Sequence, residues 1–313
     1  MDSTSDPSLR SFVPVAADSD FPIQNLPFGC FAPRAGGETR IGVAIGEFVL
    51  DLRALCEAGL LDLPEIRERA VLSATSLAPF MALGRTAWRA LRRRLSELLR
   101  AEEPRLRDDA SLRARALLPM TDVSMRMPCE IADYSDFYSS REHATNVGVM
   151  FRGAENALMP NWLHLPVAYH GRAGTVVISG TDFVRPCGQT KADDAPQPSY
   201  GPTRALDFEL EVAFLVGPGT QLGEAVPVSR AFEHIFGFVL LNDWSARDLQ
   251  RWEYQPLGPF LGKNFCTTIS PWVVTVDALE PFRTTGPVQE PAPLAYLENR
   301  GERTFDRGLE VAL

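Results

Sequence analysis

One short segment, Leu206-Asp-Phe-Glu-Leu-Glu-Val212, limits most strongly how this chain can fold. Side chains alternate between the two faces of a strand, so Asp207, Glu209 and Glu211 share one face while apolar residues fill the other. Carboxylates at this spacing repel one another unless a positive charge lies between them. A hard cation with oxygen ligands is the simplest partner. The sequence therefore predicts a strand over residues 206–216 that carries part of a cation site.

The best candidate for a catalytic base is the histidine that ends a second polar segment, Asp136-Phe-Tyr-Ser-Ser-Arg-Glu-His143. The chain has four histidines. A histidine is more often structural than catalytic, and we expect this of His164 and His234. His143 lies among tyrosine, arginine and aspartate residues, where an imidazole can accept a proton near neutral pH. No GxSxG sequence is present, so nothing indicates a serine nucleophile.

A third polar group follows the apolar segment 235–241, which predicts a strand buried on both faces. Helical spacing beyond this segment places Asp243, Arg247, Gln250 and Tyr254 on one side of a helix. Two interpretations remain open. These residues face a ligand, or they form an exposed helix face on which Asp243 is only the N-cap.

A glycine-rich segment, Gly258-Pro-Phe-Leu-Gly-Lys263, is similar to a phosphate-binding loop. It is shorter than that motif, and Asn264 stands where a Ser or Thr would hold magnesium. We therefore exclude nucleotide binding. Lys263 and the nearby Thr267 supply a charge and a hydroxyl to a substrate, or they are surface residues beside a turn.

Charge and cysteine content exclude several classes of partner and site. A net charge of −9 and a pI of about 5.1 argue against nucleic acid and anionic membranes. The five cysteines are scattered without a CxxC pair, which indicates a reducing compartment and no zinc site. The polar N-terminus predicts no signal peptide, and no run of about 18 apolar residues predicts a membrane span. We expect a cytoplasmic protein.

The chain is expected to form two domains, residues 1–127 and 128–313. The segment 117–128 is predicted to be the linker between them. The second domain is dominated by short strands and ends in an alternating segment, 309–313, that is typical of a strand.

The first domain is predicted to be β-rich with helices attached. Turn residues separate short strands near residues 29–31 and 40–50. Asp51 is predicted to cap a short helix, and apolar residues at helical spacing predict a longer helix over residues 85–101. The arginines of this longer helix are expected to form a solvated face.

These segments resemble the fumarylacetoacetase family, hydrolases that split a carbon–carbon bond of a β-diketone. The similarity runs from about Ser11 to the end of the chain. The run 242–248 also occurs in relatives that are hydratases, decarboxylases and isomerases. The segments 19–27 and 160–166 are more specific for the fumarylacetoacetase family. The segments that carry the resemblance are Ser19–Pro27, Asp133–Arg141, Pro160–Pro166, Tyr169–Arg172, Asn242–Asp248 and Pro256–Lys263.

The resemblance implies a role for each matching residue. The implied ligands of a divalent cation, calcium or magnesium, are Asp136, Glu209, Glu211 and Asp243. Lys263 and Thr267 resemble residues beside a second, structural magnesium, and His143 resembles the base that activates water. The groups that resemble substrate-holding residues are Tyr138, Arg152, Tyr169, Arg247, Gln250, Tyr254 and Lys263. Asp207 has no counterpart role, and we expect it to support the site indirectly.

The resemblance also implies a fold, an assembly and a reaction. The implied fold is mainly β with some α: an SH3-like barrel followed by a mixed β-roll, assembled as a homodimer. The implied substrate is a small diketo acid, 4-fumarylacetoacetate, which is cleaved to fumarate and acetoacetate in the final step of tyrosine and phenylalanine catabolism.

The chain departs from the family pattern at its C-terminal end. The resemblance implies that family members continue past Leu313 and that the continuing part carries the glutamate that orients the base. We therefore expect a truncated β-roll domain and impaired hydrolysis. The alternatives are a non-catalytic cation-binding remnant or a relative that acts on another diketo acid.

Overall fold

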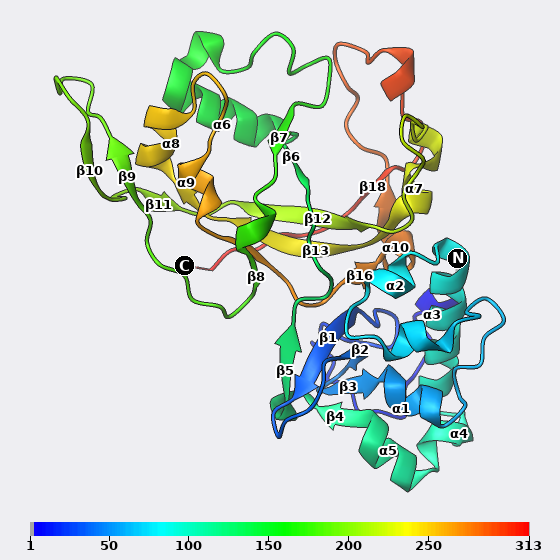
Figure 1. The fold of residues 1–313 in the computed structure, drawn as a ribbon. Helices are drawn as coiled ribbons and strands as arrows, with labels where there is room; N and C mark the ends of the chain where they lie inside the picture. The colour runs from blue at the N-terminus through cyan, green and yellow to red at the C-terminus, as the bar shows by residue number, and fades with distance from the viewer. Residues whose placement is uncertain (1–2, 313) are drawn as a thin grey trace.

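A computed structural model of the chain describes residues 3–312. Two strand-rich parts lie one above the other in Figure 1, and each is built around a five-stranded sheet with helices packed on it. The expected strand-rich fold with an N-terminal β domain and a second β-rich region is confirmed. None of the helices within residues 3–312 has the length and apolar character needed to cross a membrane.

The N-terminal sheet has the strand order β4-β3-β2-β1-β5, and every neighbouring pair is antiparallel. A turn at Gly46 joins β2 to β3, and this glycine has a φ of 52°. An added Cβ there would lie 2.5 Å from the carbonyl oxygen of Pro14, so glycine is required. The strands are β1 (Phe28–Pro33), β2 (Arg40–Ile45), β3 (Phe48–Asp51), β4 (Leu117–Pro119) and β5 (Val123–Arg126).

The segment predicted to be a linker belongs to this sheet, so that prediction is wrong. Residues 117–119 form β4, which pairs with β3, and residues 123–126 form β5, which pairs with β1. The alternate apolar side chains of the segment are used for packing, and Val123 is buried against Phe31 and Val49.

Helices cover the N-terminal sheet. Asp51 caps α1 by accepting hydrogen bonds from the amides of Arg53 and Ala54, as predicted. The predicted long helix is α3, which buries Trp88, Leu91 and Leu95. The helices of this part are α1 (Leu52–Glu57), α2 (Ala78–Met81), α3 (Arg85–Leu99), α4 (Pro104–Arg107) and α5 (Ala110–Ala116).

One arginine of α3 does not lie on a solvated face. Arg92 is 1% exposed and donates to the carbonyl oxygens of Gln24 and Asn25, at 2.5 and 2.6 Å, and to the hydroxyl of Thr4. The expectation of a solvated arginine face is therefore wrong for Arg92, because helical spacing alone cannot reveal backbone carbonyls supplied by a distant segment.

The second sheet has the order β12-β13-β15-β8, and β16 also pairs with β13. Among the strand pairs of this sheet within residues 3–312, the β15–β8 pair is parallel and the others are antiparallel. The strands are β8 (Val176–Ile178), β12 (Leu210–Val216), β13 (Ile235–Asp243), β15 (Thr267–Ile269) and β16 (Val274–Thr275).

Short strand pairs and helices surround this sheet. The pairs are β6 (Ser135–Phe137) with β7 (Ala168–His170), β9 (Cys187–Thr190) with β10 (Ser199–Pro202), β11 (Leu206–Asp207) with β14 (Ser245–Ala246), and β17 (Arg283–Thr284) with β18 (Thr304–Phe305). The helices are α6 (Arg141–Arg152), α7 (Ala231–His234), α8 (Arg247–Glu253), α9 (Leu261–Asn264) and α10 (Val276–Leu279).

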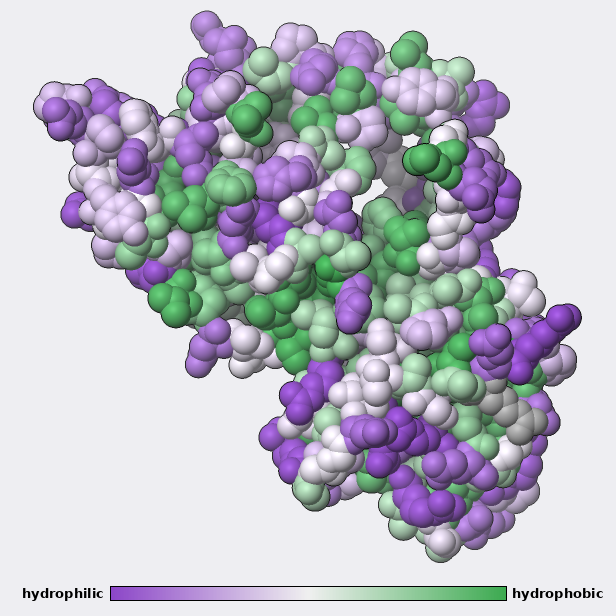
Figure 2. Space-filling view, viewed as in Figure 1, coloured by the Kyte–Doolittle hydropathy of each residue, from purple (hydrophilic) through white to green (hydrophobic). Residues whose placement is uncertain are grey.

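A shared aromatic cluster joins the two parts. Phe236 of β13 packs against Phe28, Phe80 and Trp88 of the N-terminal part, with ring centroids 5.8, 5.8 and 5.2 Å away. The backbones of Phe28 and Val273 exchange two hydrogen bonds. Green apolar residues gather in Figure 2 where the two parts meet. This core fixes β13, the strand that ends in the polar site.

Two further strand predictions are corrected. The segment 235–241 is not buried on both faces, because Leu240 is 55% exposed. Residues 309–312 of the predicted terminal strand are outside any strand, and Leu313 lies outside the described residues. Alternation identifies side chains that would fit a strand, but it does not supply the neighbouring strand.

Candidate active site

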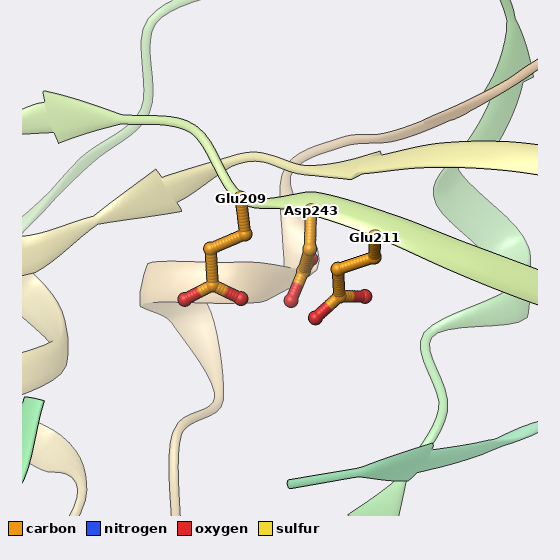
Figure 3. A group of neighbouring side chains, drawn as sticks. All are labelled: Glu209, Glu211 and Asp243. Carbon is orange, nitrogen blue, oxygen red and sulfur yellow. The ribbon is translucent and has the colours of Figure 1, made fainter. Parts of the chain in front are cut away.

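Three carboxylates converge at one end of the second sheet. Glu209, Glu211 and Asp243 each place an oxygen within 4.8 Å of the others (Figure 3). The register of β12 and β13 causes this meeting. Leu210 pairs with Asn242, and the amide of Asp243 donates to the carbonyl of Glu209. Glu211 of β12 and Glu209 just before this strand therefore lie beside Asp243, the last residue of β13.

The segment that carries two of these acids is not one continuous strand. Residues 206–207 form β11 and residues 210–216 form β12, with a break at Phe208 and Glu209. The predicted single strand is corrected on this point. Asp207 points to a different partner and accepts a hydrogen bond from Nε of Arg247 at 2.7 Å.

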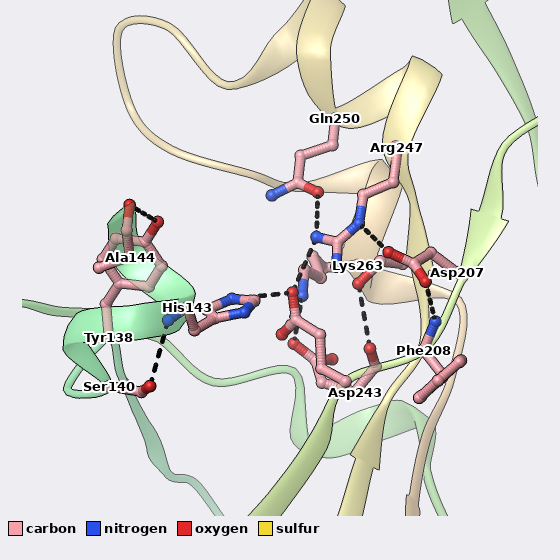
Figure 4. Close-up of polar contacts among 12 residues, drawn as sticks. Tyr138, Ser140, His143, Ala144, Asp207, Phe208, Asp243, Arg247, Gln250 and Lys263 are labelled. Atoms are coloured by element: carbon pink, nitrogen blue, oxygen red, sulfur yellow. Dashed lines mark hydrogen bonds and ion pairs between the residues drawn. The ribbon is translucent and has the colours of Figure 1, made fainter. Parts of the chain in front are cut away.

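Two positively charged side chains, those of Lys263 and Arg247, lie against the carboxylates (Figure 4). Nζ of Lys263 is 2.7 Å from Oε2 of Glu209 and 2.7 Å from Oδ2 of Asp243, and its side chain is buried. Nη1 of Arg247 is 2.7 Å from Oε1 of Glu209. Within residues 3–312, no ion pair or hydrogen bond joins the side chain of Glu211 to a cation.

Asp136 joins the group through an arginine to which the sequence analysis gave no role. Nη1 of Arg172 is 2.6 Å from Oδ2 of Asp136, and its Nη2 is 2.5 Å from Oδ1 of Asp243. Asp136 is not one of the three mutually close carboxylates. The only sequence signal for Arg172 was its place in the Tyr169–Arg172 segment.

His143 faces the same cluster from α6. The hydroxyl of Ser140 caps this helix by accepting from the amide of His143. Nε2 of His143 lies 3.4 Å from Oε1 of Glu209, and its side chain is 35% exposed. Glu209 is therefore the carboxylate that lies against this ring, although the sequence pattern offered none for that position.

Burial and neighbouring charges change the protonation of these acids in opposite directions. Burial, followed by repulsion from Asp136, Asp243 and Glu209, raises the pKa of Glu211 to about 8. Burial also raises the pKa of Asp243, although Lys263 and Arg172 oppose it. Burial opposes the shift of Glu209, yet the contacts with His143, Lys263 and Arg247 hold its pKa below the ordinary value.

The residues expected on one helix face come from two elements. Asp243 ends β13 and is not an N-cap, because α8 begins at Arg247 with Ala246 at its N-cap. Arg247 and Gln250 still meet, with Nη1 donating to Oε1 of Gln250 at 3.1 Å. Tyr254 is the C-cap of α8, packs its ring on Phe151, and accepts a hydrogen bond from the side-chain amide of Gln255.

Other predicted site residues lie around the cluster at different distances. Thr267 donates to Oδ1 of Asp243 at 3.5 Å. Tyr169 pairs with Asp136 in the β6–β7 register, and burial followed by the nearby Asp136 raises its pKa above the ordinary value. Tyr138 packs edge-on against the ring of His143. Arg152 donates to backbone carbonyls at 156 and 157 and not to the carboxylates.

A glutamate outside the cluster holds the loop that carries Lys263. The carboxylate of Glu253 accepts hydrogen bonds from the amides of Phe260, Leu261 and Gly262, at 2.9, 3.0 and 2.6 Å. A Cβ at Gly262 would lie 2.8 Å from the amide nitrogen of Gln250, so this glycine lets the loop pack on α8. Glu253 carries no sequence signal for this role, because its partners are backbone amides of a later segment.

Comparison with known proteins identifies the family. Two family models match, Fumarylacetoacetase N-terminal over residues 24–128 and Fumarylacetoacetate (FAA) hydrolase C-terminal over residues 133–289. Fumarylacetoacetases of Bos taurus, Homo sapiens and Arabidopsis thaliana are 59%, 56% and 52% identical to the chain over 97% of its length and 72% of theirs. The chain belongs to the fumarylacetoacetase family. A solved fumarylacetoacetate hydrolase from psychrophilic Exiguobacterium antarcticum is 20% identical, with a TM-score of 0.42 over 82% of this chain and 69% of its own.

The donor set of this fumarylacetoacetase-family chain fits a divalent cation. The three converging groups are all carboxylates, the ligands that hard cations such as calcium and magnesium prefer. Glu211 is half-buried, and within residues 3–312 no cationic side chain lies at ion-pair distance from its carboxylate. Burial, followed by the charges of Asp136, Asp243 and Glu209, raises its pKa although Lys263 opposes the shift. A bound cation would supply the missing positive charge.

Proposed function

We propose that the protein is a hydrolase that cleaves 4-fumarylacetoacetate to fumarate and acetoacetate, the final step of tyrosine and phenylalanine catabolism. The observation that carries the proposal is the meeting of Glu209, Glu211 and Asp243 with Lys263 and His143. Its support from relatives is their identity of 52–59% to proteins named Fumarylacetoacetase. This identity favours the proposed substrate over another diketo acid, and the polar cluster around Glu209 disfavours a non-catalytic remnant.

We assign the cation site to Asp136, Glu209, Glu211 and Asp243. A divalent cation held by these residues would supply Lewis-acid polarisation of a substrate carbonyl. Calcium and magnesium are both proposed, because the ligands are oxygens only. Lys263 and Thr267, which contact Asp243, are proposed to lie beside a second cation, magnesium.

His143 is proposed as the general base. The contact between its Nε2 and Glu209 favours the tautomer that carries the proton on Nε2, which leaves Nδ1 to accept a proton from water. The released hydroxide equivalent attacks the carbonyl carbon, and the carbon–carbon bond breaks with its electron pair leaving as an enolate. Base catalysis of this kind typically contributes about 10²–10⁴-fold to the rate.

Hydrogen-bond donors across the site from His143 are proposed to stabilise the negative charge that develops on the substrate. Lys263, Arg247 and Gln250 form a connected set of hydrogen-bonding groups around Glu209. Preorganised donors are worth more in a buried site than in water. The residues proposed to hold other parts of the diketo acid are Tyr138, Arg152, Tyr169 and Tyr254.

Three further properties are proposed together with the activity. The domain boundary is proposed at residues 127 and 128, just beyond β5. Homodimer formation is supported by large apolar side chains exposed on the β12–β13 sheet, including Phe214 and Leu240. A cytoplasmic location is supported by the five free cysteines. Light scattering on a sizing column tests the dimer.

Disappearance of the diketone absorbance tests the proposed function. Purified protein is assayed with fumarylacetoacetate after treatment with a chelator, and again after calcium or magnesium is added. We expect hydrolysis that depends on the cation and is lost in Asp243→Asn. Absence of any cation-dependent turnover in the wild-type protein would refute the proposal.

A further inference from the structure

The buried guanidinium of Arg172 links two strands that are distant in the sequence. It bridges Asp136 on β6 and Asp243 at the end of β13, through contacts of 2.6 and 2.5 Å. The side chains of all three residues are at least nine-tenths buried, with exposed fractions of 2%, 9% and 1% for Arg172, Asp136 and Asp243. Water therefore contributes little to separating or screening these charges.

Two aromatic rings lie near this guanidinium. Its central carbon lies 5.7 Å from the ring centroid of Tyr134 and 5.3 Å from that of Tyr169. An arginine presents a rigid fork of donors, so it can contact two carboxylates at once in a fixed geometry. A lysine has a single ammonium on a flexible chain and cannot reproduce this geometry.

The positively charged side chains are shared unequally among these acids, so Asp136 depends on Arg172 for its neutralisation. Asp243 has Lys263 as a second cationic partner, and Glu209 has both Lys263 and Arg247. Within residues 3–312, Arg172 is the only cation at ion-pair distance from Asp136. The negative charge of Asp136 also repels that of Glu211, and this repulsion contributes to the raised pKa of Glu211.

We propose that Arg172 is a positioning residue for the cation site. Its guanidinium holds Asp136 beside Asp243 against the repulsion of the neighbouring carboxylates, so the fourth acid is in place before a cation binds. The inference rests on the proposed function, because it takes the four carboxylates as the cation site. Arg172 acts through Asp136 and Asp243 and does not itself contact the substrate.

A purely electrostatic role of Arg172 would change the cation affinity in a different way from a positioning role. If Arg172 only added positive charge, Arg172→Met would increase the affinity for a cation and Arg172→Lys would leave it unchanged. If Arg172 positions Asp136, both substitutions weaken binding, because neither side chain can span the two carboxylates. Loss of a group that orients metal ligands typically weakens metal affinity by about 10–100-fold.

Calorimetric titration of the chelator-treated full chain with calcium chloride, and separately with magnesium chloride, distinguishes these cases. The variants are Arg172→Met and Arg172→Lys, and the control is Arg230→Met, which removes an exposed arginine paired with Glu233. We expect affinity to fall by about 10–100-fold in both Arg172 variants and to be unchanged in the control. Unchanged or tighter binding in Arg172→Lys overturns the proposal.

Two further measurements show whether a change in cation affinity comes from misfolding or from a wrong assignment of the function. Near-ultraviolet circular dichroism establishes that each variant is folded, and if Arg172→Met is not, Arg172→Lys decides the outcome. Wild-type protein that binds a cation but does not hydrolyse the diketone refutes the proposed function while leaving the role of Arg172 testable by affinity. Wild-type protein that hydrolyses the diketone, with both Arg172 variants binding calcium normally, refutes only the role of Arg172.

Discussion

Nε2 of His143 lies 3.4 Å from Oε1 of Glu209, the same oxygen that is 2.7 Å from Nη1 of Arg247. One carboxylate oxygen therefore connects the proposed base to the proposed donors, while the other oxygen contacts Lys263. This arrangement couples the orientation of the imidazole to the same residue that is proposed to bind a cation.

Replacement of His143 by alanine should remove catalysis and leave cation binding intact. The imidazole is the proposed proton acceptor, so turnover is expected to fall by about 10²–10⁴-fold. Calcium affinity should change little, because His143 contacts only one of the proposed ligands and is partly exposed. Steady-state turnover and calorimetric titration measure the two effects. Near-normal turnover would remove His143 from the mechanism.

Replacement of Lys263 by methionine should destabilise the fold. Lys263 is 1% exposed and neutralises both Glu209 and Asp243. Removing one member of a buried ion-pair group typically costs about 3–5 kcal/mol, because the remaining charges are left uncompensated. Urea unfolding in the presence of a chelator measures the change.

The control for Lys263→Met is Arg300→Met, which removes an exposed arginine paired with Glu298. Exposed pairs contribute about 0–1 kcal/mol, so its unfolding midpoint should match the wild type closely. Equal stability of both variants would contradict the role of Lys263 as the shared cation.

The positions of these groups show which parts of the site can be predicted from sequence. Local patterns placed Asp51 at a helix start and Glu209 and Glu211 on the same side of the chain, because both depend on neighbours within a few residues. The same pattern was wrong for Asp207, which pairs with Arg247. The break at Phe208 and the meeting of Asp243 with Glu209 depend on the register between β12 and β13. A single sequence carries no direct signal for that register.

Two functional candidates were missed for a related reason. Arg172 and Glu253 look like ordinary charged residues in the sequence. Their importance comes from partners in other segments, the carboxylates of Asp136 and Asp243 for the first and the amides of residues 260–262 for the second. Arg172 lies in a segment that carries the family resemblance, whereas Glu253 lies between two such segments, and the resemblance assigned a contact to neither.

Replacement of Glu253 by glutamine should lower turnover without abolishing cation binding. Both carboxylate oxygens of Glu253 accept backbone hydrogen bonds, and a glutamine amide group can replace only one of them as an acceptor. The loop before Lys263 would then shift. A displacement of about 1 Å near reacting groups can cost about 10²-fold in rate. The ratio kcat/KM measures the effect.

A matched control for Glu253→Gln is Glu298→Gln, which makes the same chemical change in an exposed pair with Arg300. Its kcat/KM should equal that of the wild type. If Glu253→Gln also retained wild-type kcat/KM, the loop contact would be irrelevant to the position of Lys263.

Stability of the cation-free protein should fall as the pH rises, because of Glu211. Its pKa is about 8 in the folded chain, against an ordinary value of 4.5. The folded state therefore binds this proton more tightly than the unfolded state. The resulting stabilisation is complete below about pH 4.5 and is lost as the pH rises through about 8. Asp243, whose pKa is also raised, contributes in the same direction.

Glu211→Gln isolates the contribution of this one residue, because glutamine has a similar shape and does not titrate. Urea unfolding with a chelator at pH 6 and pH 9 should show a larger loss of stability in the wild type than in Glu211→Gln. The lowered pKa of Glu209 does not affect this comparison, because that group titrates below its ordinary value of 4.5. Added calcium should restore wild-type stability at pH 9, where Glu211 is ionised and available as a ligand, and should restore Glu211→Gln much less. Parallel pH profiles for the two proteins would show that Glu211 is not the unneutralised acid of the site.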